Sequence, residues 1–229
     1  MKTIINNIYE VFSKYKLPNK IEGCEHCISE DDSKIFYNKT LRELTNEDMN
    51  NYYFSGILTW GTVNELKYFI PRIIELIEYD YISLNVDIEP IISKLHYAKW
   101  LNWNKNEIDS LRLYFKRKII NEISSYTIYD ERIISIDDWL CAIGIIENEY
   151  HSYLNEWSEN DNENAYKNLT EYIIDNTDFI LRKKRLKNAY WEGCNYDNDK
   201  ITIDWIKSDI VYNKLSNVIK KYKYVIEGI

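Results

Sequence analysis

Only 6 glycines and 3 prolines are spread over 229 residues, and this scarcity constrains the fold more than any other feature of the sequence. Strand-rich folds place glycine and proline in many tight turns, so a chain with few of them is expected to form long helices. Apolar residues recur at helical spacing along most of the chain, without strand alternation or an Asn-Gly hairpin signal. The sequence therefore predicts an all-α protein, an irregular antiparallel helical bundle or a short α-solenoid.

The length and the internal pattern favour one domain. A chain of 229 residues can bury a sizeable core without disulfides or a structural metal. One polar stretch, residues 158–164, interrupts the apolar pattern and is the place where a weak subdivision is expected. We therefore predict a single helical domain over residues 1–229.

Short motifs predict several helix boundaries. A hydroxyl residue followed three positions later by an acid satisfies the free N–H groups at a helix N-terminus. This pattern occurs at Thr45–Asp48, Thr62–Glu65 and Ser135–Asp138. Pro71 lies inside the apolar stripe of residues 66–77 and predicts a kink or a division into two short helices, with Arg72 near Trp100 and Trp103. The last helices are expected at residues 165–176, 178–188 and 202–226.

Charge and hydropathy indicate the class of partner and the cellular location of the chain. The net charge is −8, which disfavours nucleic acid and anionic membranes and suits a basic protein partner. No signal-peptide pattern follows Met1, and no apolar run approaches the 18 residues or so of a membrane span. The expected location is the cytoplasm.

Cys24 and Cys27, with His26 between them, form the most conspicuous local motif. A structural zinc needs four ligands, and the chain has no second closely spaced pair. The other histidines and cysteines are isolated in sequence: His96, Cys141, His151 and Cys194. We therefore predict no metal and no cofactor, and Cys24 and Cys27 are only candidates for a metal site.

Signatures of catalysis are absent from the sequence. There is no Walker loop, no glycine-rich dinucleotide turn and no nucleophile elbow, and only 3 histidines are available as general acids or bases. Glu147 and His151 are four residues apart and could share one helix face. The basic run of residues 181–187 is typical of a solvated surface, with a phosphate or nucleic-acid contact as the functional alternative.

Several segments resemble a widespread uncharacterised family of bacterial proteins. They are the Gly23-Cys24-x-x-Cys27 motif, the Thr59-Trp60-Gly61 motif, the segment from Tyr68 to Leu76 that contains Phe69-Ile70-Pro71-Arg72-Ile73, and the Lys94-Leu95-x-Tyr97-Ala98-x-Trp100-x-x-Trp103 segment. The resemblance covers roughly residues 4–120. It implies a cytosolic bacterial setting and a helical fold, but no mechanism.

The leading hypothesis is a non-enzymatic, protein-binding protein. The 21 tyrosines and 7 tryptophans could anchor an interface, and the acidic charge would steer a basic partner toward it. A bacterial immunity or antitoxin-like factor that occludes a toxin fits this description. The alternative is an enzyme whose pocket lies between the Pro71 and Trp100 segments. The candidate pocket or interface residues are Arg72, Glu75, His96, Trp100 and Trp103.

Overall fold

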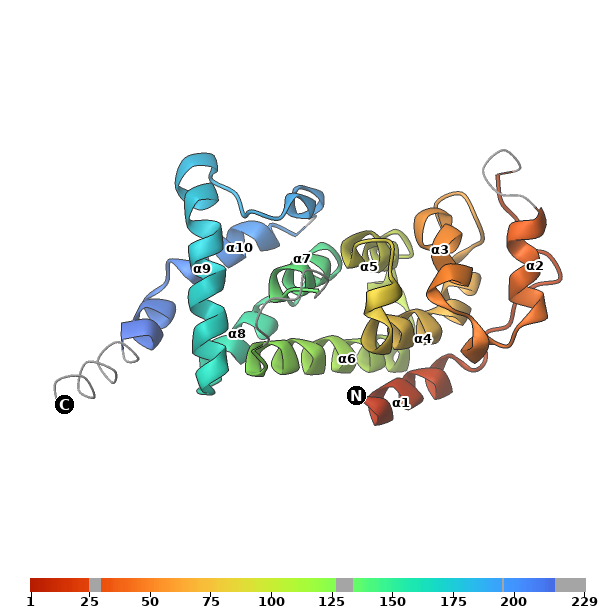
Figure 1. Cartoon of the computed structure of the whole chain (residues 1–229), viewed down its shortest axis with the longest axis horizontal. Coiled ribbons are helices and arrows are strands. Elements are labelled where there is room, and N and C mark those ends of the chain that lie inside the picture. Colours follow the sequence, from red (N-terminus) through yellow and green to blue (C-terminus); the bar gives the residue numbers. More distant parts are fainter. Residues whose placement is uncertain (25–29, 127–133, 195, 217–229) are drawn as a thin grey trace. The chain divides into compact units, whose positions relative to one another are not determined.

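The structure is a computed structural model that describes residues 1–24, 30–126, 134–194 and 196–216 (Figure 1). Of the residues in these ranges, 73% are helical. Across the described ranges there is no β-strand, and the β-type pairing consists of two isolated bridges, Gly23–Trp60 and Gly56–Trp60. The predicted all-α fold is therefore confirmed. No helix in these ranges has the length and apolar character that crossing a membrane requires.

Contacts within the chain divide it into two compact units. Unit 1 contains Met1–Phe115, and unit 2 contains almost all of the chain from Lys116 onward. The division falls inside one helix, α6 (Lys105–Ser124), and not in the polar stretch 158–164. That stretch lies within unit 2, where it joins two helices. That the chain forms one domain stays a prediction.

Unit 1 is built from short helices around α4. Its elements are α1 (Lys2–Phe12), α2 (Glu30–Asn38), η1 (Leu41–Glu43), α3 (Asn46–Ser55), α4 (Val63–Tyr79), η2 (Tyr81–Ser83), α5 (Ile88–Tyr97), η3 (Trp100–Asn102) and the first half of α6. Helix α1 packs along α4, and α3 packs against α5 (Figure 1). Ile5, Ile8 and Phe12 bury the apolar face of α1. This periodicity explains why α1 forms where the sequence predicts it.

The predicted capping motifs are present. Thr45, Thr62 and Ser135 each occupy an N-cap, and the acid three residues later accepts a hydrogen bond from the N-cap backbone N–H. For α4, this bond joins Thr62 N to Glu65 Oε2 at 2.8 Å. Reciprocal bonds of this kind satisfy N–H groups that the first helical turn leaves without partners.

The predicted division at Pro71 is wrong, because α4 runs as one helix from Val63 to Tyr79 with Pro71 inside it. The predicted kink at Pro71 stays a prediction. Proline removes one backbone donor and costs about 3 kcal/mol in a helix interior. Ile70 and Ile74 flank it in sequence and are both buried, and the buried stripe continues on each side. Burial of both halves in one core explains why the helix tolerates the proline.

Other boundaries differ from the sequence prediction. The sequence also predicts that the helix capped by Thr45 extends through Trp60, but α3 ends at Ser55 and Trp60 lies in the following turn. The segments 165–176 and 178–188 merge into one helix, α9 (Glu163–Lys183). Helix α2 was not predicted, because its sequence is polar and lacks an apolar stripe. The last predicted helix, 202–226, is in part α10 (Asn198–Ile206), and residues beyond 216 lie outside the described ranges.

Unit 2 packs around α7. Its elements are the second half of α6, α7 (Ile136–Ile146), α8 (His151–Glu159), α9, η4 (Ala189–Gly193) and α10, and residues 209–216 are also helical. Helix α7 is buried on all sides from Trp139 to Ile146 and contacts η4 and α10. Trp157 of α8 donates its indole N–H to the carbonyl of Ala165 at 3.0 Å. Trp157 thus has the polar partner that a buried indole N–H requires.

Candidate functional site

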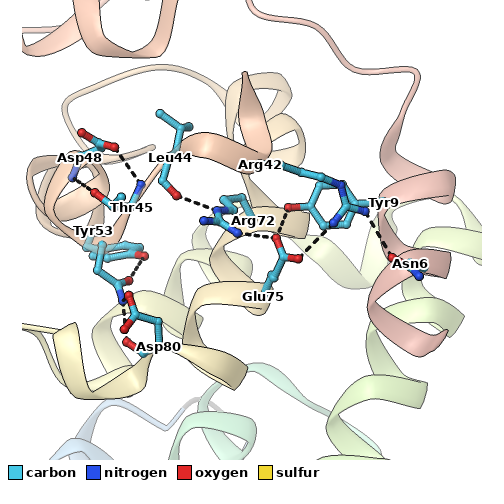
Figure 2. Close-up of polar contacts among 11 residues, drawn as sticks. Asn6, Tyr9, Arg42, Leu44, Thr45, Asp48, Tyr53, Arg72, Glu75 and Asp80 are labelled. Carbon is cyan, nitrogen blue, oxygen red and sulfur yellow. Dashed lines mark hydrogen bonds and ion pairs between the residues drawn. The ribbon is translucent and has the colours of Figure 1, made fainter. Parts of the chain in front are cut away.

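Glu75, one of the predicted candidates, lies at the centre of a polar network in unit 1 (Figure 2). Its carboxylate accepts hydrogen bonds from Tyr9 Oη at 2.6 Å, Arg42 Nη1 at 3.0 Å and Arg72 Nη1 at 2.6 Å. Burial, followed by the hydrogen bond to Glu75, raises the pKa of Tyr9 well above its usual range. Three donors thus occupy most of the roughly four acceptor positions of the Glu75 carboxylate.

Arg72 binds the chain backbone as well as Glu75. Its Nε donates to the carbonyl of Leu44 at 2.7 Å, which ties the segment before α3 to α4 (Figure 2). The Arg42 guanidinium stacks on the Tyr9 ring at 3.6 Å. Arg72 and Glu75 are thus brought together, and both join α4 to its neighbours.

A second carboxylate, Glu107, is fully buried on α6 and binds three donors. Lys67 Nζ and Lys14 Nζ lie 2.7 Å from its two oxygens, and Tyr15 Oη donates to it at 2.6 Å. Burial alone raises the pKa of Glu107, but these hydrogen bonds outweigh burial and hold the pKa at about 2. Trp103, another predicted candidate, lies with its ring 4.3 Å from Lys67 Nζ. Its indole N–H donates to the carbonyl of Ala98.

The remaining predicted candidates lie elsewhere. Trp100 is buried in the core and meets Phe115 edge to face. His96 contacts the ring of Tyr97. The recorded polar contacts of Arg72 lead to Leu44 and Glu75 and not to the tryptophans. Arg72 and Glu75 therefore belong to one network and Trp103 to another.

Of the two cysteines predicted as metal-ligand candidates, the structure describes only Cys24. Cys24 is exposed, and Cys27 lies outside the described residues. In the part of the chain that the structure describes, no three His, Cys, Asp or Glu side chains gather as metal ligands would. Glu147 and His151 do not share a helix, because Glu147 follows the last residue of α7 and His151 begins α8. The oxygen Oε1 of Glu147 accepts from the backbone N–H groups of Asn148 and Glu149, so the predicted pairing on one helix face is wrong.

Three large apolar side chains are exposed near the ends of α3 and α5 and in the turn after α3, and we call them the apolar patch: Phe54, Leu58 and Tyr97. They are 56%, 52% and 59% exposed, respectively. Phe54 and Leu58 lie at the end of α3 and in the turn after it. Tyr97 is the last residue of α5, one turn beyond Lys94. Lys94 Nζ lies 3.3 Å from the carbonyl of Phe54, which brings these two helix ends together.

The turn that carries Leu58 has a strained backbone. Ile57 has a φ of 61°, a conformation that is costly for a β-branched residue. The surrounding backbone holds it there: Ile57 N donates to the carbonyl of Trp60 at 2.8 Å, and Gly61 N donates to the carbonyl of Glu22 at 2.7 Å. Cys24 N donates to the carbonyl of Thr59 at 2.8 Å. Such strain persists where neighbouring contacts determine the conformation, often at functional sites.

Lys94 connects α5 to the end of α3, and these two helix ends carry Phe54 and Tyr97 of the apolar patch. It is buried, and burial lowers the pKa of its amine to about 8. Its ammonium group lies at the C-terminal end of α3, where free carbonyls and the helix dipole favour a cation. Lys94 therefore acts as a cap that holds the end of α3 against α5.

Neither the apolar patch nor Lys94 is predicted as a site from the sequence. Phe54, Leu58 and Tyr97 are ordinary apolar residues in sequence, and only packing shows that they are not core residues. Two segments singled out in the sequence touch this region: the Thr59-Trp60-Gly61 motif, which marks the turn, and the segment that begins at Lys94 and contains Tyr97. Gly61 has a φ of 75°, a conformation that glycine adopts without strain.

Comparisons with known proteins returned no matching family model, curated protein or solved structure.

Proposed function

We propose that this protein binds another protein without catalysing a reaction, and that the apolar patch is the contact surface. The observation that carries the proposal is the exposure of three large apolar side chains, of which Leu58 lies on a turn with a strained, hydrogen-bonded backbone and Phe54 and Tyr97 lie at helix ends. A rigid turn that presents large apolar side chains loses little conformational entropy on binding. Aromatic side chains of this kind commonly dominate the energy of protein interfaces.

The polar clusters of unit 1 support a binding role over a catalytic one. Glu75 and Glu107 each accept hydrogen bonds from three donors, which leaves them little capacity to act on a substrate. A general acid or base needs a proton that it can exchange near neutral pH. The pKa of Glu107, about 2, lies far from that range.

The expected partner is a basic protein. The net charge of −8 attracts a cationic surface at long range, and the apolar patch supplies short-range contact. A toxin that the bound chain occludes is the partner class that we propose, with the cytoplasm as the place of encounter. This role corresponds to that of an immunity or antitoxin-like factor.

The test starts from the products of the genes adjacent to the one that encodes this chain. Each product is purified and titrated calorimetrically with the wild-type chain and with Leu58→Asp, which places a charge in the apolar patch. The matched control is Ile82→Asp, since Ile82 is also an exposed apolar residue of unit 1. Loss of a hot-spot contact costs about 2 kcal/mol, which is roughly a 30-fold weaker affinity.

We expect a basic neighbouring product to bind the wild type and the Ile82→Asp variant equally and the Leu58→Asp variant far more weakly. The affinity should fall as salt is raised, because screening weakens the charge attraction. Equal binding by all three chains would show that the patch is not the contact surface. A neighbourhood of metabolic enzymes, none of which binds the chain, would contradict the proposed function itself.

A further inference from the structure

Helix α9 carries one apolar stripe that is buried within unit 2 and a second stripe that is exposed. The inner stripe is buried: Ala165, Leu169, Tyr172, Asn176 and Ile180. On the outer side, Ile174 and Leu181 are 66% and 65% exposed and lie seven residues apart. Residues at this spacing share one helix face.

Two threonines complete the outer stripe, which we call the outer seam: Thr170, Ile174, Thr177 and Leu181. All four are exposed, and their spacing of four, three and four residues is that of a coiled-coil seam. The hydroxyl of Thr170 donates to the carbonyl of Tyr166 at 2.9 Å, and that of Thr177 donates to the carbonyl of Ile173 at 2.6 Å. The helix itself thus satisfies the hydroxyl groups, and a partner need not supply polar groups to the seam.

Charge is distributed unevenly along the same helix. The part before Thr177 carries the acidic residues Glu171 and Asp175, and Asp178 follows directly after Thr177. The end is basic, with Arg182, Lys183 and Lys184 followed by Arg185 and Lys187. The present pairs on this surface, Asp178–Arg182 at 2.7 Å and Asp175–Lys187 at 3.5 Å, are exposed and therefore weak.

We infer that the outer seam of α9 is a self-association surface, on which α9 of a second copy of this chain packs in antiparallel orientation. A two-fold axis near Thr177 places Ile174 of one copy against Leu181 of the other. It also brings the acidic part of each helix beside the basic end of its partner. A parallel arrangement would instead align like charges. The outer seam is thus complementary to itself, as an isologous interface requires.

The size of the seam sets the expected affinity. Stable interfaces bury about 1,200 Å² or more, and a single pair of helices over three turns falls at or below this limit. We therefore expect a reversible dimer with a dissociation constant of roughly micromolar order. The outer seam shares no residue with the apolar patch, because α9 belongs to unit 2 and the patch to unit 1.

Sedimentation velocity tests the inference on the full chain over concentrations from roughly 1 to 100 µM, which bracket a micromolar dissociation constant. The wild type is expected to shift from monomer to dimer over this range, and to dissociate further when salt is raised. Ile174→Asp combined with Leu181→Asp should remain monomeric. Leu113→Asp, at another exposed leucine on a helix, is the matched control and should dimerise as the wild type does.

Cysteine cross-linking tests the orientation. In an antiparallel pair only residues near the two-fold axis meet their own copies, so Thr177→Cys should form an interchain disulfide under mild oxidation. Thr170→Cys should not cross-link to itself, and the wild type measures the background from the native cysteines. A wild type that stays monomeric, or a dimer that survives the double substitution, would overturn the inference. Equal cross-linking at 170 and 177 would overturn the antiparallel arrangement.

Discussion

The indole ring of Trp191 occupies the space beside Gly144 that a side chain would fill. A Cβ atom on Gly144 would lie 2.4 Å from Cζ3 of Trp191, far closer than two carbon atoms approach. Gly144 lies within α7, and Trp191 belongs to η4. The contact explains a glycine inside a helix, where it costs about 1 kcal/mol relative to alanine.

Gly144→Ala is therefore expected to destabilise unit 2 despite the better helix propensity of alanine. Displacing a packed ring costs about 1–3 kcal/mol, which exceeds the gain in propensity. Urea denaturation measures the change in the free energy of unfolding. Gly193→Ala is the control, since no atom lies within 4 Å of its added methyl group. A Gly144→Ala variant as stable as the wild type would show that the Trp191 ring moves freely.

Glu107→Gln should strongly destabilise unit 1. The substitution removes the buried negative charge and leaves the ammonium of Lys67 in the interior without its counter-charge. Breaking a buried ion pair by removing one partner costs about 3 kcal/mol or more. Asp109→Asn on the same helix breaks only the exposed pair with Lys105 and should cost less than about 0.5 kcal/mol. Equal effects of the two substitutions would contradict this account.

The same carboxylate predicts a loss of stability in acid. The pKa of Glu107 is about 2 in the folded protein, below the ordinary value of 4.5. Its stabilising effect is therefore present above pH 4.5 and is lost as the pH falls toward 2. The free energy of unfolding, measured across this pH range, should depend less on pH in the Glu107→Gln variant than in the wild type.

Asp137 in unit 2 has the opposite effect to Glu107: we expect its contribution to stability to fall as the pH rises. Burial, followed by the negative charge of Asp138, raises the pKa of Asp137 to about 6. Trp191, Tyr172 and Lys187 lower it by smaller amounts. Between pH 4 and 6 the folded state retains a proton that the unfolded state has lost, so stability falls as the pH rises through this window, by about 3 kcal/mol at most.

Asp137→Asn is expected to remove this loss of stability between pH 4 and 6. The variant should gain stability over the wild type as the pH rises from 4 to 7, measured by thermal unfolding at each pH. Asp204→Asn changes an exposed carboxyl on α10 and serves as the control. A difference between Asp137→Asn and the wild type that stays constant with pH would refute the raised pKa.

Ile57→Gly should raise the stability of unit 1 by about 1 kcal/mol, because glycine adopts a positive φ without the penalty of a β-branched side chain. If the clamped turn serves partner binding, the same variant should bind more weakly, since its free state is more flexible. The melting temperature and the calorimetric titration measure the two effects on one sample. A lower melting temperature would mean that packing of the Ile57 side chain outweighs its strain.

The sequence by itself determined the helical class and many of its boundaries. Capping boxes such as Thr62–Glu65 depend on atoms a few residues apart, and apolar periodicity such as that of α1 depends on the helix repeat. Both are local, so the residue pattern predicts them. The local preference of Pro71 predicts a division into two helices, whereas burial of both halves of α4 keeps the helix continuous.

The tertiary structure alone decided which side chains meet and which stay exposed. Tyr9 and Glu75 are 66 residues apart in sequence, and Lys67 and Glu107 are 40 apart, yet each pair forms a hydrogen bond. Leu58 and Leu66 are the same residue type, but one is exposed and the other is buried. The physical reason is that burial and charge pairing depend on distances that arise when helices pack, and no local pattern encodes those distances.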